Sequence, residues 1–171
     1  MPEPWVLHAT HLVPDGVAVV DLACGSGRHG RWFLANDHAV TFVDRDIGAL
    51  QDLAGRPGAS VRQADLESPA FDPAVVLPPG GFGGVVVVNY LHRPLLPAIV
   101  AAVAPGGVLI YQTFAAGNAR HGKPSNPAFL LQPGELLEAV RGRLTVLRYE
   151  HGEGLLDRPA VVQRIVARRE A

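Results

Sequence analysis

The segment Val17-Ala-Val-Val-Asp-Leu-Ala-Cys-Gly-Ser-Gly-Arg-His-Gly30 decides the fold. Its first six residues, Val17–Leu22, form an apolar run that predicts a buried β-strand. Gly25 and Gly27 then allow positive φ angles and a close approach of the backbone to a ligand. The helix predicted to follow presents unpaired N–H groups in its first turn. We therefore expect a strand, a glycine loop and a helix in succession, with a polar ligand above the loop.

The rest of the chain alternates between short apolar runs and segments that carry a helical stripe. Further strands are predicted at 39–43, 61–64, 85–88, 107–114, 144–150 and 160–167. Helices are predicted at 28–36, 47–54, 94–103 and 134–141. The proline-rich stretch 66–81 is expected to be mostly loop. Because only a loop joins the last two strands, they should pair antiparallel.

These elements predict an α/β fold in a single domain over residues 1–171. Its sheet is mostly parallel, with helices on both faces and an antiparallel hairpin at the C-terminal edge. The composition fits this class: 15 basic and 16 acidic residues give a charge of −1, with no basic stripe for nucleic acid. A single cysteine excludes an internal disulfide and a cysteine-built zinc site. Without a signal pattern or a membrane-spanning run, we expect a cytoplasmic protein.

Three carboxylates near the predicted strand ends indicate the kind of ligand. Asp44 follows Gly25 by 19 residues, the offset at which a carboxylate accepts both hydroxyls of a ribose. The string Gly25-Ser-Gly-Arg-His-Gly30 alone does not distinguish a dinucleotide from another adenosine cofactor. However, Asp21 would repel a pyrophosphate and attract an ammonium group. Asp65, after the third strand, is placed to accept from an adenine amino group, so a dinucleotide is disfavoured.

Four motifs resemble those of a known family over nearly the whole chain. They are Asp21–Gly30, Val43-Asp-Arg-Asp46, Asn89-Tyr-Leu-His-Arg-Pro94 and Phe129-Leu-Leu-Gln-Pro-Gly-Glu-Leu136. With them the chain resembles class I S-adenosylmethionine-dependent methyltransferases, in particular small bacterial members of the tellurite-resistance-like branch. The resemblance implies a Rossmann-like fold with strand order 3-2-1-4-5-7-6 and the last strand antiparallel. It implies S-adenosylmethionine as the cofactor and a methyl acceptor that the sequence does not identify.

By the same resemblance, the glycine loop would hold the methionine part of the cofactor, Asp44 the ribose and Asp65 the adenine edge. The cofactor-binding positions implied are Asp21, Ala23, Gly25, Gly27, Arg28, Asp44, Arg45, Asp65, Leu66 and Asn89. Ala23 departs from the pattern, since many relatives have a glycine there. We expect cofactor binding to survive this change because Gly25 and Gly27 remain.

Candidates for catalysis follow the fourth strand, at the position of the family's substrate-side motif. Methyl transfer needs a base only when the acceptor must lose a proton. Histidine is the side-chain type best suited to exchange a proton near neutral pH, so His92, with Tyr90, is a candidate for that role; the alternative is that His92 only begins a helix. A small-molecule methyltransferase is therefore the first hypothesis. A non-catalytic module that binds the cofactor for regulation or assembly is the second. A short nicotinamide-dependent oxidoreductase is the third, and the sequence lacks the Tyr-x-x-x-Lys pair expected of it.

Several other residues have more ordinary interpretations. Cys24 beside the glycines is expected to be a small buried hydrophobe. His8 and His11 lack a third partner, so no metal is predicted. Trp5 either closes over the pocket or anchors the N-terminus to the core.

Two segments are expected to shape the acceptor side of the site. The N-terminal segment, residues 1–16, is short where many relatives carry helices that cover the substrate. The loop 115–131 leaves the same rim of the sheet as the cofactor, and a loop this long in a compact domain is often a binding element. We expect it to cover the acceptor pocket, with Arg120, His121 and Lys123 available to recognise an anionic or polar acceptor.

Overall fold

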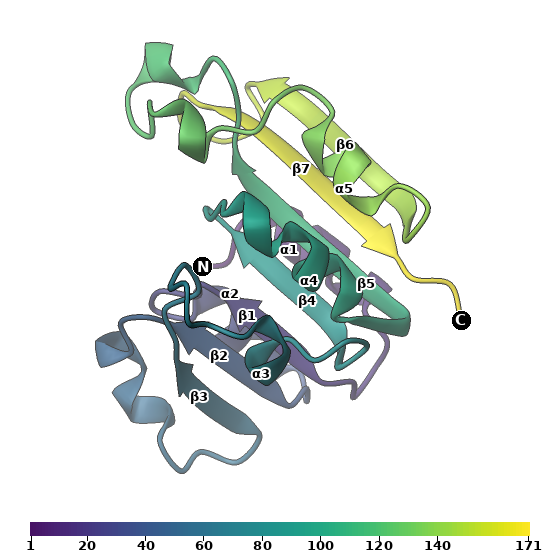
Figure 1. The fold of residues 1–171 in the computed structure, drawn as a ribbon. Helices are drawn as coiled ribbons and strands as arrows, with labels where there is room; N and C mark the ends of the chain where they lie inside the picture. Colours follow the sequence, from purple (N-terminus) through teal and green to yellow (C-terminus); the bar gives the residue numbers. More distant parts are fainter.

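The computed structural model describes residues 1–171 and contains one sheet of seven strands (Figure 1). The strands are β1 (Val19–Leu22), β2 (Val40–Asp44), β3 (Ala59–Gln63), β4 (Phe82–Val88), β5 (Val103–Phe114), β6 (Thr145–Glu153) and β7 (Val161–Arg168). Their order is β3-β2-β1-β4-β5-β7-β6. The first five pair in parallel, and β7 lies antiparallel between β5 and β6. The predicted fold class, strand order and C-terminal hairpin are confirmed.

Five short α-helices cover the two faces of this sheet. They are α1 (Pro4–Ala9), α2 (Arg28–Ala35), α3 (Pro73–Val76), α4 (Leu96–Ala101) and α5 (Glu135–Val140). Helices α1 and α2 lie behind the sheet in Figure 1, and α3, α4 and α5 lie in front of it. Helices on both faces explain why the central strands are continuous apolar runs, because both sides of each strand are buried.

The hydrophobic core consists of two layers separated by the sheet. Consecutive residues of β4 alternate between them: Val85 and Val87 pack with α4 and α5, whereas Val86 and Val88 pack with α1 and α2. This alternation is the two-residue period of a strand. The layers comprise 25 and 16 buried residues, so the larger one lies beneath α3, α4 and α5. Together they fix the sheet whose upper edge carries the site.

The structure differs from or refines the prediction in four segments. The helix expected at 47–54 is a 3₁₀ turn over Gly48–Leu53, and its buried Leu50 and Leu53 have the three-residue spacing of such a turn. The stretch 66–81 is mostly loop, as predicted, and also contains the four-residue α3, where Asp72 caps the Ala74 N–H group and a proline begins the helix. The N-terminal segment forms α1 and a 3₁₀ turn, Thr10–Leu12.

The fourth difference concerns the loop 115–131, which contains two 3₁₀ turns, Asn118–His121 and Pro127–Phe129. The strand before it, β5, begins four residues earlier than predicted, at Val103, and the helix before that strand ends at Ala101. No helix in the structure combines the length and the apolar character needed to cross a membrane.

Candidate functional site

A cavity of about 680 Å³ opens where the parallel strands β1 to β5 end. This is the edge at which open α/β sheets bind their ligands. Seven of the twelve residues predicted for the site line it: Ala23, Asp44, Arg45, Asp65, Leu66, Asn89 and Tyr90. The other five, Asp21, Gly25, Gly27, Arg28 and His92, lie outside its lining. The cavity is within the size range of small-molecule sites.

The glycine loop after β1 is tied to the end of β2 by Asp44. The Gly25 N–H group donates to Asp44 Oδ2 over 2.8 Å, and the Asp46 N–H group donates to Oδ1 over 2.9 Å. A carboxylate has about four lone-pair sites, so each oxygen can still accept one ribose hydroxyl. Asp44 is therefore already oriented by the backbone, which lowers the entropy lost when a ligand binds.

Two strand ends in the cavity carry backbone conformations that side chains rarely adopt. Ala23 has a φ of 51° and Asn89 a φ of 59°, both in the left-handed region. Asparagine tolerates this region, but alanine is strained there by about 1–2 kcal/mol. Because both residues line the cavity, the strained backbone lies at the cavity wall, as is common at functional sites.

On the β3 side the cavity wall combines apolar and acidic groups. Asp65 follows β3, and its Oδ1 accepts the Glu67 N–H group over 3.1 Å. Leu66 is buried next in sequence, and Arg45 joins the lining after the neighbouring strand β2. An apolar surface next to a carboxylate suits a flat purine that carries an amino group. The arrangement agrees with the adenine position that the sequence resemblance implies for Asp65.

Asp21 lies beneath the glycine loop, with only 1% of its surface exposed. Its Oδ2 accepts the Gly30 N–H group of α2 over 2.7 Å. Burial raises the pKa of this carboxyl to about 7, and the Gly30 hydrogen bond only partly offsets that rise. The structure thus gives Asp21 a role in holding α2 to β1, behind the cavity wall.

Gly27 and Arg28 begin α2 and serve packing and the N-terminal segment. Gly27 has a φ of 76°, and a Cβ atom there would lie 2.9 Å from the ring of Phe42. Arg28 donates to Glu3 over 3.1 Å, and Glu3 is 5% exposed. The Arg28 guanidinium is therefore engaged by the N-terminal segment and turned from the cavity.

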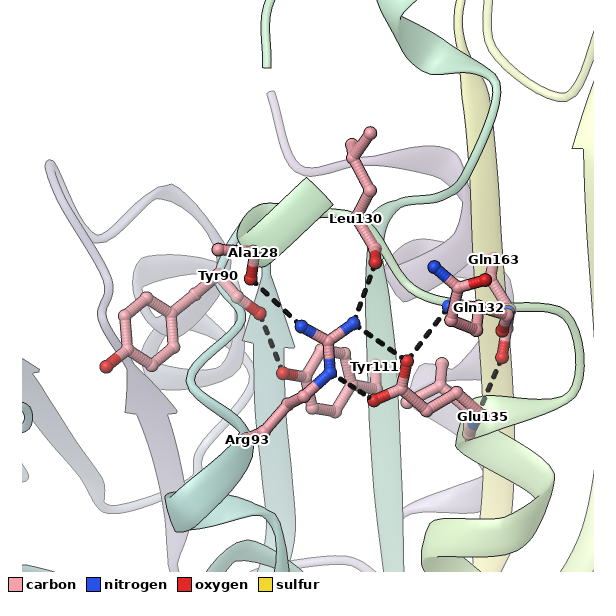
Figure 2. Close-up of polar contacts among 9 residues, drawn as sticks. Tyr90, Arg93, Tyr111, Ala128, Leu130, Gln132, Glu135 and Gln163 are labelled. Carbon is pink, nitrogen blue, oxygen red and sulfur yellow. Dashed lines mark hydrogen bonds and ion pairs between the residues drawn. The ribbon is translucent and has the colours of Figure 1, made fainter. Parts of the chain in front are cut away.

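Tyr90 is the catalytic candidate that reaches the cavity. Its hydroxyl is buried and has no hydrogen-bond partner, while its backbone carbonyl accepts the Tyr111 hydroxyl over 2.7 Å (Figure 2). Burial, followed by the charges of Glu67 and Asp65, raises the pKa of the Tyr90 phenol well above its usual range. Tyr90 therefore remains protonated at neutral pH, and its hydroxyl is available to donate a hydrogen bond. A ligand oxygen or nitrogen would relieve the cost of this unpaired buried group.

His92 lies one step away from the cavity. Its Nδ1 is 3.5 Å from Glu67 Oε1, and Glu67 itself lines the cavity. His92 also precedes the 3₁₀ turn Arg93–Leu95, as its more ordinary interpretation predicted. It can reach a ligand only through Glu67 or after a change of rotamer.

Three lining residues were not predicted from the sequence: Glu67, which follows β3, and Thr113 and Phe114 in β5. Thr113 and Phe114 end β5, and their signal was the position alone, since a residue at the carboxyl end of a central strand faces this edge. Arg93 and Glu135, which belong to two of the family motifs, were not predicted either. Arg93 Nε donates to Glu135 Oε2 over 2.7 Å, across 42 residues of sequence.

The loop 115–131 contributes Pro124 and Phe129 to the cavity lining, and its role as a cover for the acceptor stays a prediction. The expectation for its cations is wrong. Arg120 and His121 both pair with Glu153 at the end of β6, and neither they nor Lys123 line the cavity. The loop is polar because it is anchored to the hairpin through this carboxylate.

Two further residues have the ordinary roles considered for them. Trp5 packs in the core, donates to the Ile165 carbonyl over 3.4 Å and lies under the Arg164 guanidinium, so it anchors the N-terminal segment. Cys24 is buried, and burial raises the pKa of its thiol to about 12. No cluster of three or more His, Cys, Asp or Glu side chains could hold a metal ion.

Comparisons with solved structures identify proteins of the same fold. The 1,6-didemethyltoxoflavin-N1-methyltransferase of Burkholderia thailandensis, solved with 1,6-didemethyltoxoflavin and S-adenosylhomocysteine, is 20% identical, with a TM-score of 0.72 over 99% of this chain and 78% of that one. TehB from Haemophilus influenzae is 18% identical, with a TM-score of 0.72 over 99% of this chain and 63% of TehB.

The [4+2]-cyclase SpnF also has this fold, at 16% identity and a TM-score of 0.69 over 98% of this chain and 80% of that one. No family model and no curated protein matches the sequence. The likenesses confirm the Rossmann-like methyltransferase fold that the sequence resemblance implied, including a likeness to TehB proteins. Identities of 16–20% establish a shared fold and do not by themselves establish a shared activity.

Proposed function

We propose that the protein is an S-adenosylmethionine-dependent methyltransferase that acts on a small-molecule acceptor. The observation that carries the proposal is one cavity in which Asp44 and Asp65, at the ends of the neighbouring strands β2 and β3, follow in a row from the strained loop that begins at Ala23 after β1. These groups match the hydroxyls of a ribose and the amino edge of an adenine. The fold is that of the Burkholderia methyltransferase, which was solved with S-adenosylhomocysteine.

The residues present fit this cofactor. Asp44 would hold the ribose, Asp65 and Leu66 the adenine, and the backbone around Ala23 and Gly25 the methionine part. The buried Tyr90 hydroxyl, which has no partner in the protein, supports a ligand at the same place. When bound, the cofactor supplies a methyl group on a positively charged sulfur, which is a good leaving group.

The chain's own contribution is to position the reactants and to exclude water. Tyr90, protonated at neutral pH, would donate a hydrogen bond to a ligand atom. His92 is the candidate to take a proton from the acceptor, with Glu67 orienting its imidazole. Asn89, in its left-handed conformation, directly follows β4 and would turn the chain so that Tyr90 faces the cavity. These roles for Tyr90, Asn89 and His92 are proposals.

Titration calorimetry tests the cofactor assignment. S-adenosylhomocysteine should bind and NADH should not. Asp44→Ala should weaken S-adenosylhomocysteine binding by about 1.5–3 kcal/mol, the range for a hydrogen bond to a charged group. Asp46→Ala is the matched control, because this exposed carboxylate lies two residues away and outside the cavity lining. Binding of NADH alone, or equal affinities for the two variants, would contradict the assignment.

A methyl-transfer assay separates the enzyme from a non-catalytic module with the same cavity. Release of S-adenosylhomocysteine in the presence of a candidate acceptor supports the enzyme. Tight cofactor binding without transfer to any acceptor, across a broad panel, favours the regulatory or assembly module.

A further inference from the structure

The part of the cavity below β5 and the loop 115–131 differs in chemistry from the part assigned to the cofactor. Here the lining consists of Thr113 and Phe114 from the end of β5 and of Pro124 and Phe129 from the loop. From this wall we infer that the acceptor is a flat aromatic or heteroaromatic molecule that carries no negative charge. The inference rests on the proposed function, because it concerns the acceptor side of the same site.

Phe129 is held in place although nearly half of its surface, 48%, is exposed. The Arg93 guanidinium donates to the carbonyl groups on both sides of it, to Ala128 over 3.1 Å and to Leu130 over 2.8 Å (Figure 2). The Asn126 side chain accepts the Ala128 N–H group over 3.0 Å. An exposed phenyl ring on a backbone fixed from three directions is a ready-made surface for stacking, since little entropy is lost when a ring packs on it.

Glu135 fixes Arg93 in turn. Its Oε2 accepts from Arg93 Nε over 2.7 Å, and its Oε1 accepts from Arg93 Nη2 over 3.0 Å. Glu135 Oε1 also accepts the Gln132 N–H group. This bidentate pair orients the guanidinium plane toward the turn that carries Phe129. Arg93 is therefore a positioning residue: four of its five N–H donors are used within the protein, and it is not part of the cavity lining. It does not serve as a site for an anionic acceptor.

The charges that line the cavity also disfavour an anion. The lining contains three carboxylates, those of Asp44, Asp65 and Glu67. Its single cation is Arg45, which follows β2. The loop cations Arg120 and His121 pair with Glu153 instead. An acceptor with a carboxylate would therefore meet repulsion without a compensating partner, whereas an amine would be attracted.

Three indoles of different charge test this class on protein saturated with S-adenosylhomocysteine: indole, tryptamine and indole-3-propionate. Chemical-shift titration should show that indole and tryptamine bind, and that indole-3-propionate binds about tenfold more weakly than tryptamine. Equal or tighter binding of the anion would overturn the inference. Failure of S-adenosylhomocysteine itself to bind would instead count against the proposed function, so the two failures are distinguishable.

Variants of the aromatic wall test the stacking surface. Phe129→Leu should weaken indole binding about two- to tenfold while the affinity for S-adenosylhomocysteine is unchanged, and Phe129→Tyr should restore it. Val75→Ala, which shortens an exposed apolar side chain outside the cavity, is the control. Indole binding that is equal in Phe129→Leu and the parent protein would overturn the role of the ring.

The positioning role of Arg93 is tested through its partner as well. Arg93→Ala and Glu135→Gln should both weaken indole binding as Phe129→Leu does, with S-adenosylhomocysteine binding retained. Glu135→Gln keeps the shape of the side chain, so it supplies the answer if Arg93→Ala does not fold. Retained indole affinity in a folded Glu135→Gln protein would contradict the positioning role.

Discussion

Replacing Asp21 by asparagine removes a buried titratable carboxyl beneath the glycine loop while nearly preserving the shape of the side chain. In the parent protein, burial raises the pKa of this carboxyl from 3.8 to about 7. A pKa that is higher in the folded than in the unfolded protein makes the unfolded state lose its proton first as pH rises. The stability associated with the neutral carboxyl is thus complete below pH 3.8 and is lost as pH rises through about 7.

The size of this loss follows from the two pKa values. One pKa unit corresponds to 1.36 kcal/mol, so the full effect is about 4 kcal/mol, and roughly 2.5 kcal/mol of it falls between pH 5 and pH 8. The free energy of unfolding of Asp21→Asn should lack this component. Going from pH 5 to pH 8, the parent protein should therefore lose about 2.5 kcal/mol more than the variant.

Urea denaturation of both proteins at the two pH values measures this difference directly, because all other titrating groups are shared. The slopes with denaturant concentration should agree between the proteins, which shows that the same surface is exposed. An equal change in the free energy of unfolding for parent and variant would refute the reasoning. It would mean that the Asp21 carboxyl is solvated and ionises as in the unfolded chain.

Three further substitutions test separate parts of the site. Ala23→Gly should raise the free energy of unfolding by about 0.5–1 kcal/mol, because relief of the left-handed strain exceeds the entropy that glycine adds to the unfolded chain. Chemical denaturation measures this free energy, and a decrease would contradict the strain at Ala23. Gly30→Ala should destabilise by about 1–3 kcal/mol, since its Cβ would lie 2.5 Å from the buried Phe42 ring; an unchanged thermal midpoint would rule out this contact. His92→Ala should lower the methyl-transfer rate and flatten its pH profile while S-adenosylhomocysteine affinity stays the same; an unchanged rate and profile would remove His92 as the base.

The strands could be predicted because their signal is local. Runs such as Val85–Val88 can only be buried on both faces, and the carboxylates that follow neighbouring strands must then meet at one edge. Asp44 and Asp65 are therefore predicted to lie close together, and both line the same cavity. The order of the strands came from the resemblance, since apolar periodicity carries no information about which strands are neighbours.

Other features depend on contacts that the sequence does not display. The spacing of Leu50 and Leu53 fits both a 3₁₀ turn and an α-helix, so the turn was predicted as a helix. The Arg93–Glu135 pair joins residues 42 positions apart, and neither residue type is unusual in its context. The ion-pair partner of a cation in a loop likewise depends on the folded structure. The place of the loop on the rim makes Arg120 and His121 available to an acceptor, whereas in the structure both pair with Glu153, which is 33 and 32 residues away in sequence.

The structure of the protein crystallised with S-adenosylhomocysteine tests the central claim most directly. We expect the ribose hydroxyls on Asp44, the adenine between Leu66 and Asp65, and the sulfur directed toward Tyr90 and the Phe114 side of the cavity. A ligand bound elsewhere, or bound here in the reverse direction with its adenine against Phe114, would contradict the account.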